Sequence, residues 1–135
     1  MLNALLNTSV IPVMEQVLNF TEARHEVLAG NIANIDTPGY RTRDLDSRMF
    51  ESQLKDAIRS RDQADGNASL SVPDSVESFH HVRDNLKAIV YHDQTNVGIE
   101  QQAIELSKNQ IQHNLATTIL SSQFQLLGAA ISERA

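Results

Sequence analysis

Hydrophobic residues recur at helical spacing near the start of the chain, between residue 10 and about residue 35. Two sets, each repeating every seven residues, interleave in steps of three and four, as in a coiled-coil stripe. The sets are Ile11, Leu18, His25 and Ile32, and Met14, Thr21, Leu28 and Ile35. A second apolar row adjoins this stripe at Val10, Val13, Val17, Phe20 and Val27. The pattern predicts one long helix that needs more than one neighbour, because two adjoining rows of it are apolar.

A second long helix is predicted near the end of the chain, from about residue 96 or 98 to about residue 132. Its two apolar rows are Ile104, Ile111, Leu115 and Ile119, and Leu120, Phe124, Leu127 and Ile131. Between Ile99 and Leu126 the only charged residues are Glu100, Glu105 and Lys108, whereas Gln and Asn occur eight times. Uncharged amides cost less to remove from water than ions do. We therefore expect this helix to meet protein on a second face.

The middle of the chain is predicted to be less regular. Residues 36–44 form a turn and a short extended piece, since Pro38-Gly39 suits the centre of a type II turn. Asp44 is the expected N-cap of a shorter helix ending near Arg61. Its apolar side carries Leu45, Met49, Leu54, Ala57 and Ile58. Residues 62–78 indicate an exposed or flexible loop, and residues 79–94 favour a short strand or hairpin, although one or two amphipathic turns fit them too.

Composition narrows the class of protein. The chain has 135 residues, a formal net charge of −6 and no cysteine. Acidic residues exceed basic ones in both halves, so no basic patch favours nucleic acid as a partner. No apolar run reaches the ~20 residues that cross a bilayer, and Glu15 and Gln16 interrupt any secretory signal. The sequence thus favours one helical domain without disulfides or a direct transmembrane segment.

The five histidines do not form a recognisable metal site. Glu22 and His25 lie three residues apart on the first predicted helix, but no complete ligand set accompanies them. His25 falls on the apolar stripe, so it is expected to be a hydrogen-bonded packing residue. Neither a nucleophile motif nor a glycine-rich phosphate loop is present. We therefore expect no catalysis, no cofactor and no bound metal ion.

Periodicity alone leaves the use of the two long helices open. They could form the core of a small antiparallel bundle, such as a stand-alone helical adaptor or chaperone, or a coiled coil that oligomerises. An autonomous bundle is helical when dilute. Circular dichroism at several protein concentrations therefore distinguishes the two.

The run LAGNIANIDTPGY, residues 28–40, resembles the N-terminal signature of bacterial flagellar rod, hook and hook-associated axial proteins. The matching residues are Asn31, Ile32, Ala33, Asn34, Asp36, Thr37, Pro38, Gly39 and Tyr40. Gly30 departs from the pattern, in which Ser is more usual. The short chain and the run YRTRDLD, residues 40–46, resemble one type of proximal rod subunit, with a sister type as the alternative. TNVGIEQQ, residues 95–102, resembles the element before its C-terminal helix, with Gly98 replacing Asp and Gln102 replacing Glu.

This resemblance covers both ends of the chain and thins out over residues 60–90. It implies a structural subunit of the flagellar basal body that leaves the cell through the type III export apparatus without a cleaved signal. The subunit would assemble with itself and other rod subunits into a helical tube across the periplasm, which transmits torque and continues the export channel. The rod-base adaptor, the MS ring and the export gate are the further partners that it implies.

The resemblance also implies a mainly α fold in three parts of one structural unit. Residues 1–35 and 96–135 are the terminal helices, expected to pair as an antiparallel coiled coil and to be disordered in the monomer. Residues 36–95 hold the elbow, the shorter helix and an irregular or small β segment. We expect the outer rows of the long helices, including the amide-rich face of the second, to pack against neighbouring subunits. The elbow, residues 31–44, would fix where the first helix stops.

Overall fold

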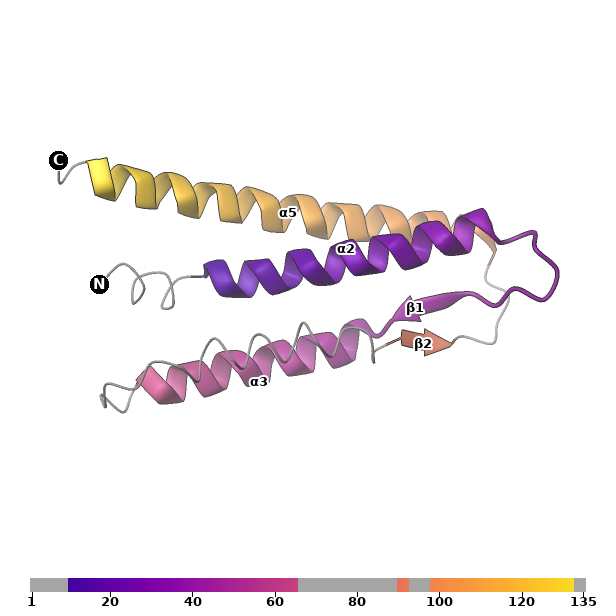
Figure 1. Cartoon of the computed structure of the whole chain (residues 1–135), viewed down its shortest axis with the longest axis horizontal. Coiled ribbons are helices and arrows are strands. Elements are labelled where there is room, and N and C mark those ends of the chain that lie inside the picture. Colours follow the sequence, from indigo (N-terminus) through magenta and orange to yellow (C-terminus); the bar gives the residue numbers. More distant parts are fainter. Residues whose placement is uncertain (1–9, 66–89, 93–97, 133–135) are drawn as a thin grey trace.

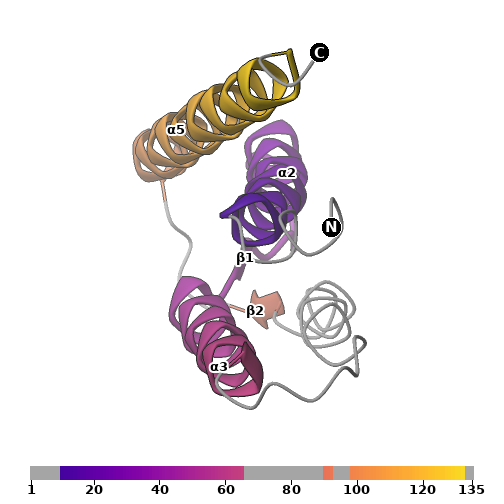
Figure 2. The same cartoon turned by 90° about the vertical axis from the view of Figure 1, so that its left-hand side faces the viewer.

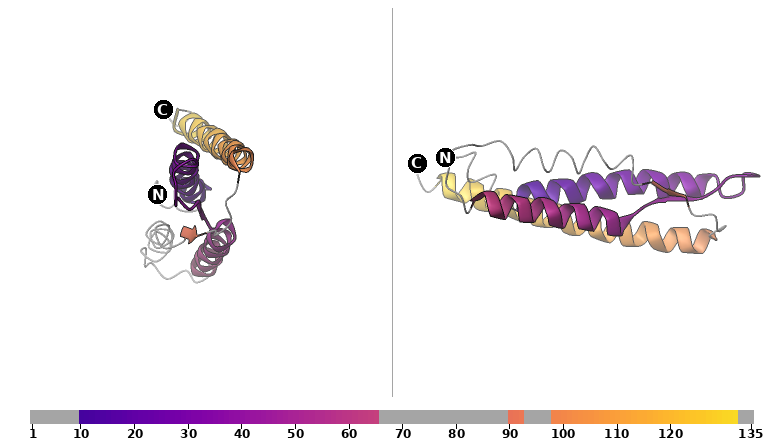
Figure 3. Two further views of the ribbon diagram at one scale, coloured as in Figure 1. Left: turned by 90° about the vertical axis from the view of Figure 1, so that its right-hand side faces the viewer. Right: turned by 90° about the horizontal axis from the view of Figure 1, so that it is seen from below.

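The computed structural model describes residues 10–65, 90–92 and 98–132. Within these ranges the elements are α2 (Ile11–Ala33), β1 (Arg43–Leu45), α3 (Ser47–Asp65), β2 (Val90–His92) and α5 (Ile99–Ser132). The helices run lengthwise (Figure 1), and α2 lies between α5 and α3 in the end-on views (Figures 2 and 3). The expected mainly α fold is therefore confirmed for the described part of the chain.

The two long helices lie against each other and run in opposite directions (Figure 1). Asn31 near the end of α2 contacts Gln102 near the start of α5, and Thr21 contacts Asn109 about two to three helical turns further on. Residue numbers thus fall along α2 as they rise along α5. The predicted contact between the terminal helices is confirmed.

An apolar core joins α2 to β1 and α3. The rings of Phe20 and Phe50 stack with centroids 4.1 Å apart and an interplanar angle of 9°. Val13, Leu45 and Ala57 complete the buried cluster. The partly buried residues packed on this cluster are Met14, Val17, Ala23, Leu54 and Ile58. The core thus covers Val13, Val17 and Phe20 of the second apolar row of α2, whereas Val10 is exposed.

Three details of the shorter helix differ from the sequence prediction. Asp46, and not Asp44, caps α3, because its carboxylate accepts from the backbone N–H groups of Arg48 (2.9 Å) and Met49 (3.1 Å). Met49 is exposed, and Phe50 occupies the buried position instead. The helix also continues to Asp65, so residues 62–65 are not part of a loop. The remainder of the predicted loop, residues 66–78, lies outside the described residues.

The predicted turn and strand are present. Gly39 has φ +78°, and the Tyr40 N–H donates to the Thr37 carbonyl at 3.0 Å, as a type II turn requires. The strands β1 and β2 pair antiparallel, with Arg43 opposite His92. The strand expected within residues 79–94 is thus confirmed at Val90–His92. The rest of that segment lies outside the described residues.

The amide-rich face of α5 was expected to point outwards, towards neighbouring subunits. Part of it instead points towards α2. Gln102 and Asn109 are buried against α2 together with Ala116. The expected apolar row is turned the other way, because Ile104, Ile111 and Leu115 are 49%, 67% and 60% exposed. Polar side chains are turned towards α2 because they find hydrogen-bond partners there.

Candidate functional site: the elbow and the polar seam

Asn31 joins four segments at the point where α2 ends. Its side chain is 0% exposed. The Nδ2 group donates to Gln102 Oε1 at 3.0 Å and to the Arg43 carbonyl, and Oδ1 accepts from Tyr40 Oη and the Arg43 N–H, both at 3.1 Å. A carboxamide has two N–H donors and two oxygen lone pairs. Asn31 therefore uses its full capacity to hold α2, the turn, β1 and α5 together.

The stop of α2 is built from the next residues of the motif. Both the backbone N–H and Nδ2 of Asn34 donate to the Gly30 carbonyl, at 3.2 and 2.8 Å, so that the last turn is capped. The Asn34 carbonyl in turn accepts from the Thr37 N–H at 2.9 Å. Asn34 therefore both caps α2 and begins the turn.

The remaining motif residues differ in exposure. Ile32 and Tyr40 are half-buried. The exposed members are Ala33, Asn34, Asp36, Thr37, Pro38 and Gly39. The elbow therefore has an inner side that Asn31 anchors and an outer side that is open to other molecules.

Arg24 makes a second junction, one heptad before Asn31. Its Nε and Nη2 donate to the two carboxylate oxygens of Asp44 at 2.8 and 2.7 Å, and Nη2 also reaches Glu105 Oε2 at 3.0 Å. The hydrogen bond to Asp44 is the main cause that raises the pKa of the buried Arg24 guanidinium. Bidentate pairing fixes orientation as well as distance. The C-terminal half of α2, β1 and the first turns of α5 are thereby held in one arrangement.

Glu105 extends this junction to the surface of α5. Its second oxygen, Oε1, accepts from Lys108 Nζ at 2.8 Å. That hydrogen bond is the main cause that lowers the pKa of Glu105, and Arg24 lowers it further. Glu105 therefore stays ionised at neutral pH and keeps both cations in place.

The middle of the contact between the two long helices is also polar. Asn109 Nδ2 donates to the Thr21 carbonyl at 2.7 Å, and Thr21 Oγ1 lies 3.0 Å from both the Leu18 carbonyl and His113 Nδ1. We call the set between the two long helices the polar seam: Thr21, Arg24, Asn31, Gln102, Glu105, Asn109 and His113. His25, expected to be the packing histidine, is exposed instead. His113 takes that place, because it faces α2 opposite Thr21.

The site holds backbone segments in place rather than presenting a reactive group. Its buried polar atoms bond mainly to one another. Glu22 and His25 share a surface hollow with His113, but no three His, Asp or Glu side chains of the described residues are arranged to hold a metal ion. Nor, in that part of the chain, is any helix long and apolar enough to cross a membrane.

The elbow is predictable from the sequence, whereas Arg24, Gln102 and Asn109 were not predicted as parts of the site. Their spacing in the sequence could have identified them. Arg24 and Asn31 are seven residues apart, and so are Gln102 and Asn109. A seven-residue repeat of polar residues on facing helices indicates a polar layer as well as an apolar one.

The residues proposed as assembly stripes fall into two groups. Half-buried or buried within the chain are Ile11, Met14, Leu18, Leu28, Ile32, Ile35, Ile119, Leu120 and Leu127. Exposed are Ile104, Ile111, Leu115, Phe124 and Ile131. Ile35 lies beyond the end of α2, in the turn. Only the exposed group is fully free, within the described residues, to contact another molecule.

Comparison with known proteins identifies the family. Residues 18–41, which include Arg24, Asn31 and Tyr40, match the family described as flagella basal body rod protein. The flagellar basal body rod protein FlgB of Salmonella typhimurium is 30% identical over 124 residues, which cover 82% of this chain and 84% of that protein. FlgB of Escherichia coli is 28% identical with the same coverage. FlgB of Aquifex aeolicus is 26% identical and covers 93% of this chain.

These relatives carry the FlgB name rather than that of the sister subunit FlgC, the alternative that the sequence left open. Their similarity extends over most of both chains, beyond the motif alone. The chain belongs to the FlgB family of flagellar basal body rod proteins.

Proposed function

We propose that this chain is a structural subunit of the proximal rod of the bacterial flagellum, with no catalytic role. Within each subunit, α2 and α5 pair as an antiparallel coiled coil, and the elbow fixes the point where α2 ends. The observation that carries this proposal is the Asn31 junction, where one residue of the matched motif bonds to the turn, β1 and α5. A motif that sets backbone geometry suits a part of a regular assembly.

Assembly into a tube is supported by what the chain leaves uncovered. Ile104, Ile111 and Leu115 are exposed along one side of α5, a surface that a monomer in water rarely maintains. We propose that this side packs against neighbouring rod subunits, both copies of this chain and other axial proteins. The rod-base adaptor, the MS ring and the export gate are the proposed partners at the rod's inner end.

The proposed location is the periplasmic span of the basal body. The chain would reach it through the flagellar type III channel, without a cleaved signal, and the tube would carry torque and continue the channel. Helices that order only on assembly fit this route, since an unfolded chain passes a narrow channel. Helical circular dichroism that is independent of protein concentration would contradict ordering on assembly.

The elbow is tested by a matched pair of glycine substitutions. An added Cβ meets nothing within 4 Å at either Gly39 or Gly30, so neither substitution creates a clash. Gly39 has φ +78°, which an alanine adopts at a cost of about 1 kcal/mol, whereas Gly30 lies inside α2. In a strain that lacks the gene, we expect Gly39→Ala to reduce swimming and rod completion. Gly30→Ala should leave both unchanged.

Export is measured separately, as the amount of secreted subunit. We expect Gly39→Ala to be exported normally, because the elbow acts after the chain leaves the channel. Normal swimming with Gly39→Ala and with Pro38→Ala would overturn the role of the elbow. A null strain that swims would overturn the rod function itself.

A further inference from the structure

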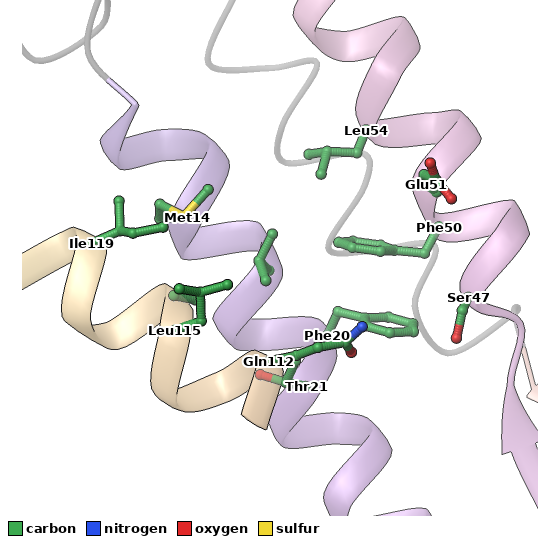
Figure 4. A pocket seen from close by; sticks show the side chains of 12 residues that line it. Met14, Phe20, Thr21, Ser47, Phe50, Glu51, Leu54, Gln112, Leu115 and Ile119 are labelled. Atoms are coloured by element: carbon green, nitrogen blue, oxygen red, sulfur yellow. The ribbon is translucent and has the colours of Figure 1, made fainter. Parts of the chain in front are cut away.

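An open apolar groove lies where α2, α3 and α5 meet. It has a volume of about 300 Å³. Figure 4 shows side chains from all three helices directed into it, with the stacked Phe20 and Phe50 at one side. Among the residues that line the groove are Met14, Val17, Ser47, Leu54, Leu115 and Ile119. Glu51 is the one ionisable residue among the twelve described residues that line the groove.

A second uncovered apolar surface lies on the same chain, at the C-terminal end of α5. We call residues 121–132 the α5 tip. The tip extends past the described start of α2 (Figure 1). Phe124, Leu126 and Ile131 are 52%, 62% and 58% exposed. From Asn109 to Ser132 the helix has no Asp, Glu, Lys or Arg.

The tip has the residue spacing of a helix that enters a groove. Phe124, Leu127 and Ile131 follow the i, i+3, i+7 pattern on one face, where Phe124 and Ile131 are exposed anchors and Leu127 is half-buried between them. Because the tip has no charge, it can enter an apolar groove without burying an unpaired ion. The groove and the tip thus match each other in chemistry.

We propose that the α5 tip of one copy of this chain docks into the groove of the next copy. This rests on the proposed rod function and adds the pair of surfaces that join one copy to its neighbour. Because the tip and the groove are different surfaces, each copy keeps one of them free after the first contact. Two copies that exchanged tips would close in a two-fold dimer, whereas a copy whose free groove takes the tip of a third copy continues the row, as a helical assembly requires. The proposed contact is of the second kind.

Two charge variants test the contact by complementation. The tip variant Phe124→Glu/Ile131→Glu changes only exposed positions, and the groove variant is Leu54→Glu. The purified full-length wild-type chain should form species larger than a dimer in sedimentation velocity, whereas each variant alone should be monomeric. A mixture retains one intact tip and one intact groove, so we expect a dimer of one chain of each variant and nothing larger. Gln125→Glu, which adds the same charge off the anchor face, should behave as wild type.

A cross-linking experiment tests the same contact without any change to the core. The chain has no cysteine, so Ser47→Cys at the groove and Ala130→Cys on the tip can each be the only thiol. A short bis-maleimide should join a mixture of these two variants. The control replaces Ser47→Cys by Ser60→Cys, an exposed position on α3 away from the groove, and should give no product.

Three results would overturn the proposal. They are a wild-type chain that stays monomeric without cross-linking, a mixture of the two charge variants that stays monomeric, and capture of a different basal-body protein by Ser47→Cys in cells. The rod function is judged independently by whether the wild-type gene restores swimming to the null strain. If it does so while the tip variant also swims, the docking is wrong and the rod function stands.

Discussion

Helix α2 contacts its two neighbours by different kinds of chemistry. Towards α3 it presents Phe20, whose ring stacks on Phe50 with centroids 4.1 Å apart. Towards α5 it presents Arg24 and Asn31, which bond to Glu105 and Gln102. One helix therefore has an apolar contact on one side and a polar contact on the other.

The two contacts therefore have different roles: the apolar contact with α3 contributes stability, and the polar contact with α5 sets the register of the two long helices. Burial of apolar surface is favourable and non-directional, so the ring stack stabilises α3 on α2 without selecting one alignment. Hydrogen bonds in a buried seam form in one alignment only, and a shift of one residue leaves donors and acceptors without partners. The polar seam thus sets how far α5 lies along α2, at some expense of stability.

The largest effect is expected on the apolar side. Phe50→Ala removes the stacked ring from a buried position and should lower the free energy of unfolding by about 3–4 kcal/mol. Urea unfolding followed by circular dichroism, at a concentration where the chain is helical, measures this. Met49→Ala, at the exposed neighbouring position, should change it by less than about 0.5 kcal/mol. Equal losses for the two variants would place the core elsewhere.

The next largest loss of stability is expected at Asn31, whose side chain makes four hydrogen bonds. Asn31→Leu keeps the size of the side chain but leaves Gln102, Tyr40 and both backbone groups of Arg43 without that partner. We expect a loss of about 2–3 kcal/mol, measured in the same way. The variant should also loosen the alignment of the long helices. Cysteine pairs placed to cross-link α2 to α5 should then react in more than one register, and a single register would contradict the role of Asn31.

Arg24→Lys tests whether the shape of the cation matters as well as its charge. Lysine cannot make the forked bonds to both oxygens of Asp44. We expect a loss of about 1.5 kcal/mol, although the net charge is unchanged. If the same substitution in the background of Asp44→Asn has no further effect, the loss is assigned to this pair. A lysine variant as stable as wild type would show that charge alone suffices.

The pH dependence of stability follows from Glu105. Its pKa lies below the ordinary value of 4.5 in the folded chain, so the unfolded chain takes up a proton at a higher pH. The stabilisation by Glu105 is therefore complete above pH 4.5 and is lost as the pH falls through the lowered folded pKa. Stability curves of wild type and Glu105→Gln should converge below pH 4.5. Parallel curves through this range would remove Glu105 from the seam.

The smallest effect is expected at Asn109, although it is as buried as Asn31. Its Nδ2 bonds to a helix carbonyl that already has an intrahelical partner, and its Oδ1 has no hydrogen-bond partner among the described residues. Asn109→Leu should therefore be neutral or stabilise the chain by up to about 1 kcal/mol. A loss as large as that of Asn31→Leu would mean that all seam positions contribute alike.

Much of the fold follows from the sequence pattern. The long helices, the Pro38-Gly39 turn and a strand near residue 90 were all predictable, because turn chemistry and helical periodicity are local properties. The sequence predicts the cap of α3 at Asp44, two residues before the observed cap, Asp46. Both aspartates suit an N-cap, and only the distant Arg24 decides that Asp44 pairs with a cation instead.

The inward face of α5 could not be derived from periodicity. Ile104, Ile111 and Leu115 form a regular apolar row, which suits a bundle core and an assembly surface equally, and they are exposed within the single chain. In a protein built for assembly, an apolar row marks a surface to be covered, and the sequence does not say by which chain. Gln102 and Asn109 are buried because they form hydrogen bonds to α2, Gln102 to the Asn31 side chain and Asn109 to the Thr21 carbonyl. Such pairing becomes visible only in three dimensions.

The saturation of Asn31 limits which residue can stand at this position. Aspartate has the same shape but offers no N–H groups and would place a negative charge next to the Gln102 oxygen. Glutamine has the same polar group one methylene further out, and histidine cannot bond to four partners at once. Serine and threonine are too short to span from α2 to both β1 and α5. Any chain that builds this junction around one side chain must therefore use asparagine. An asparagine at this position is thus a stringent marker for identifying distant rod subunits.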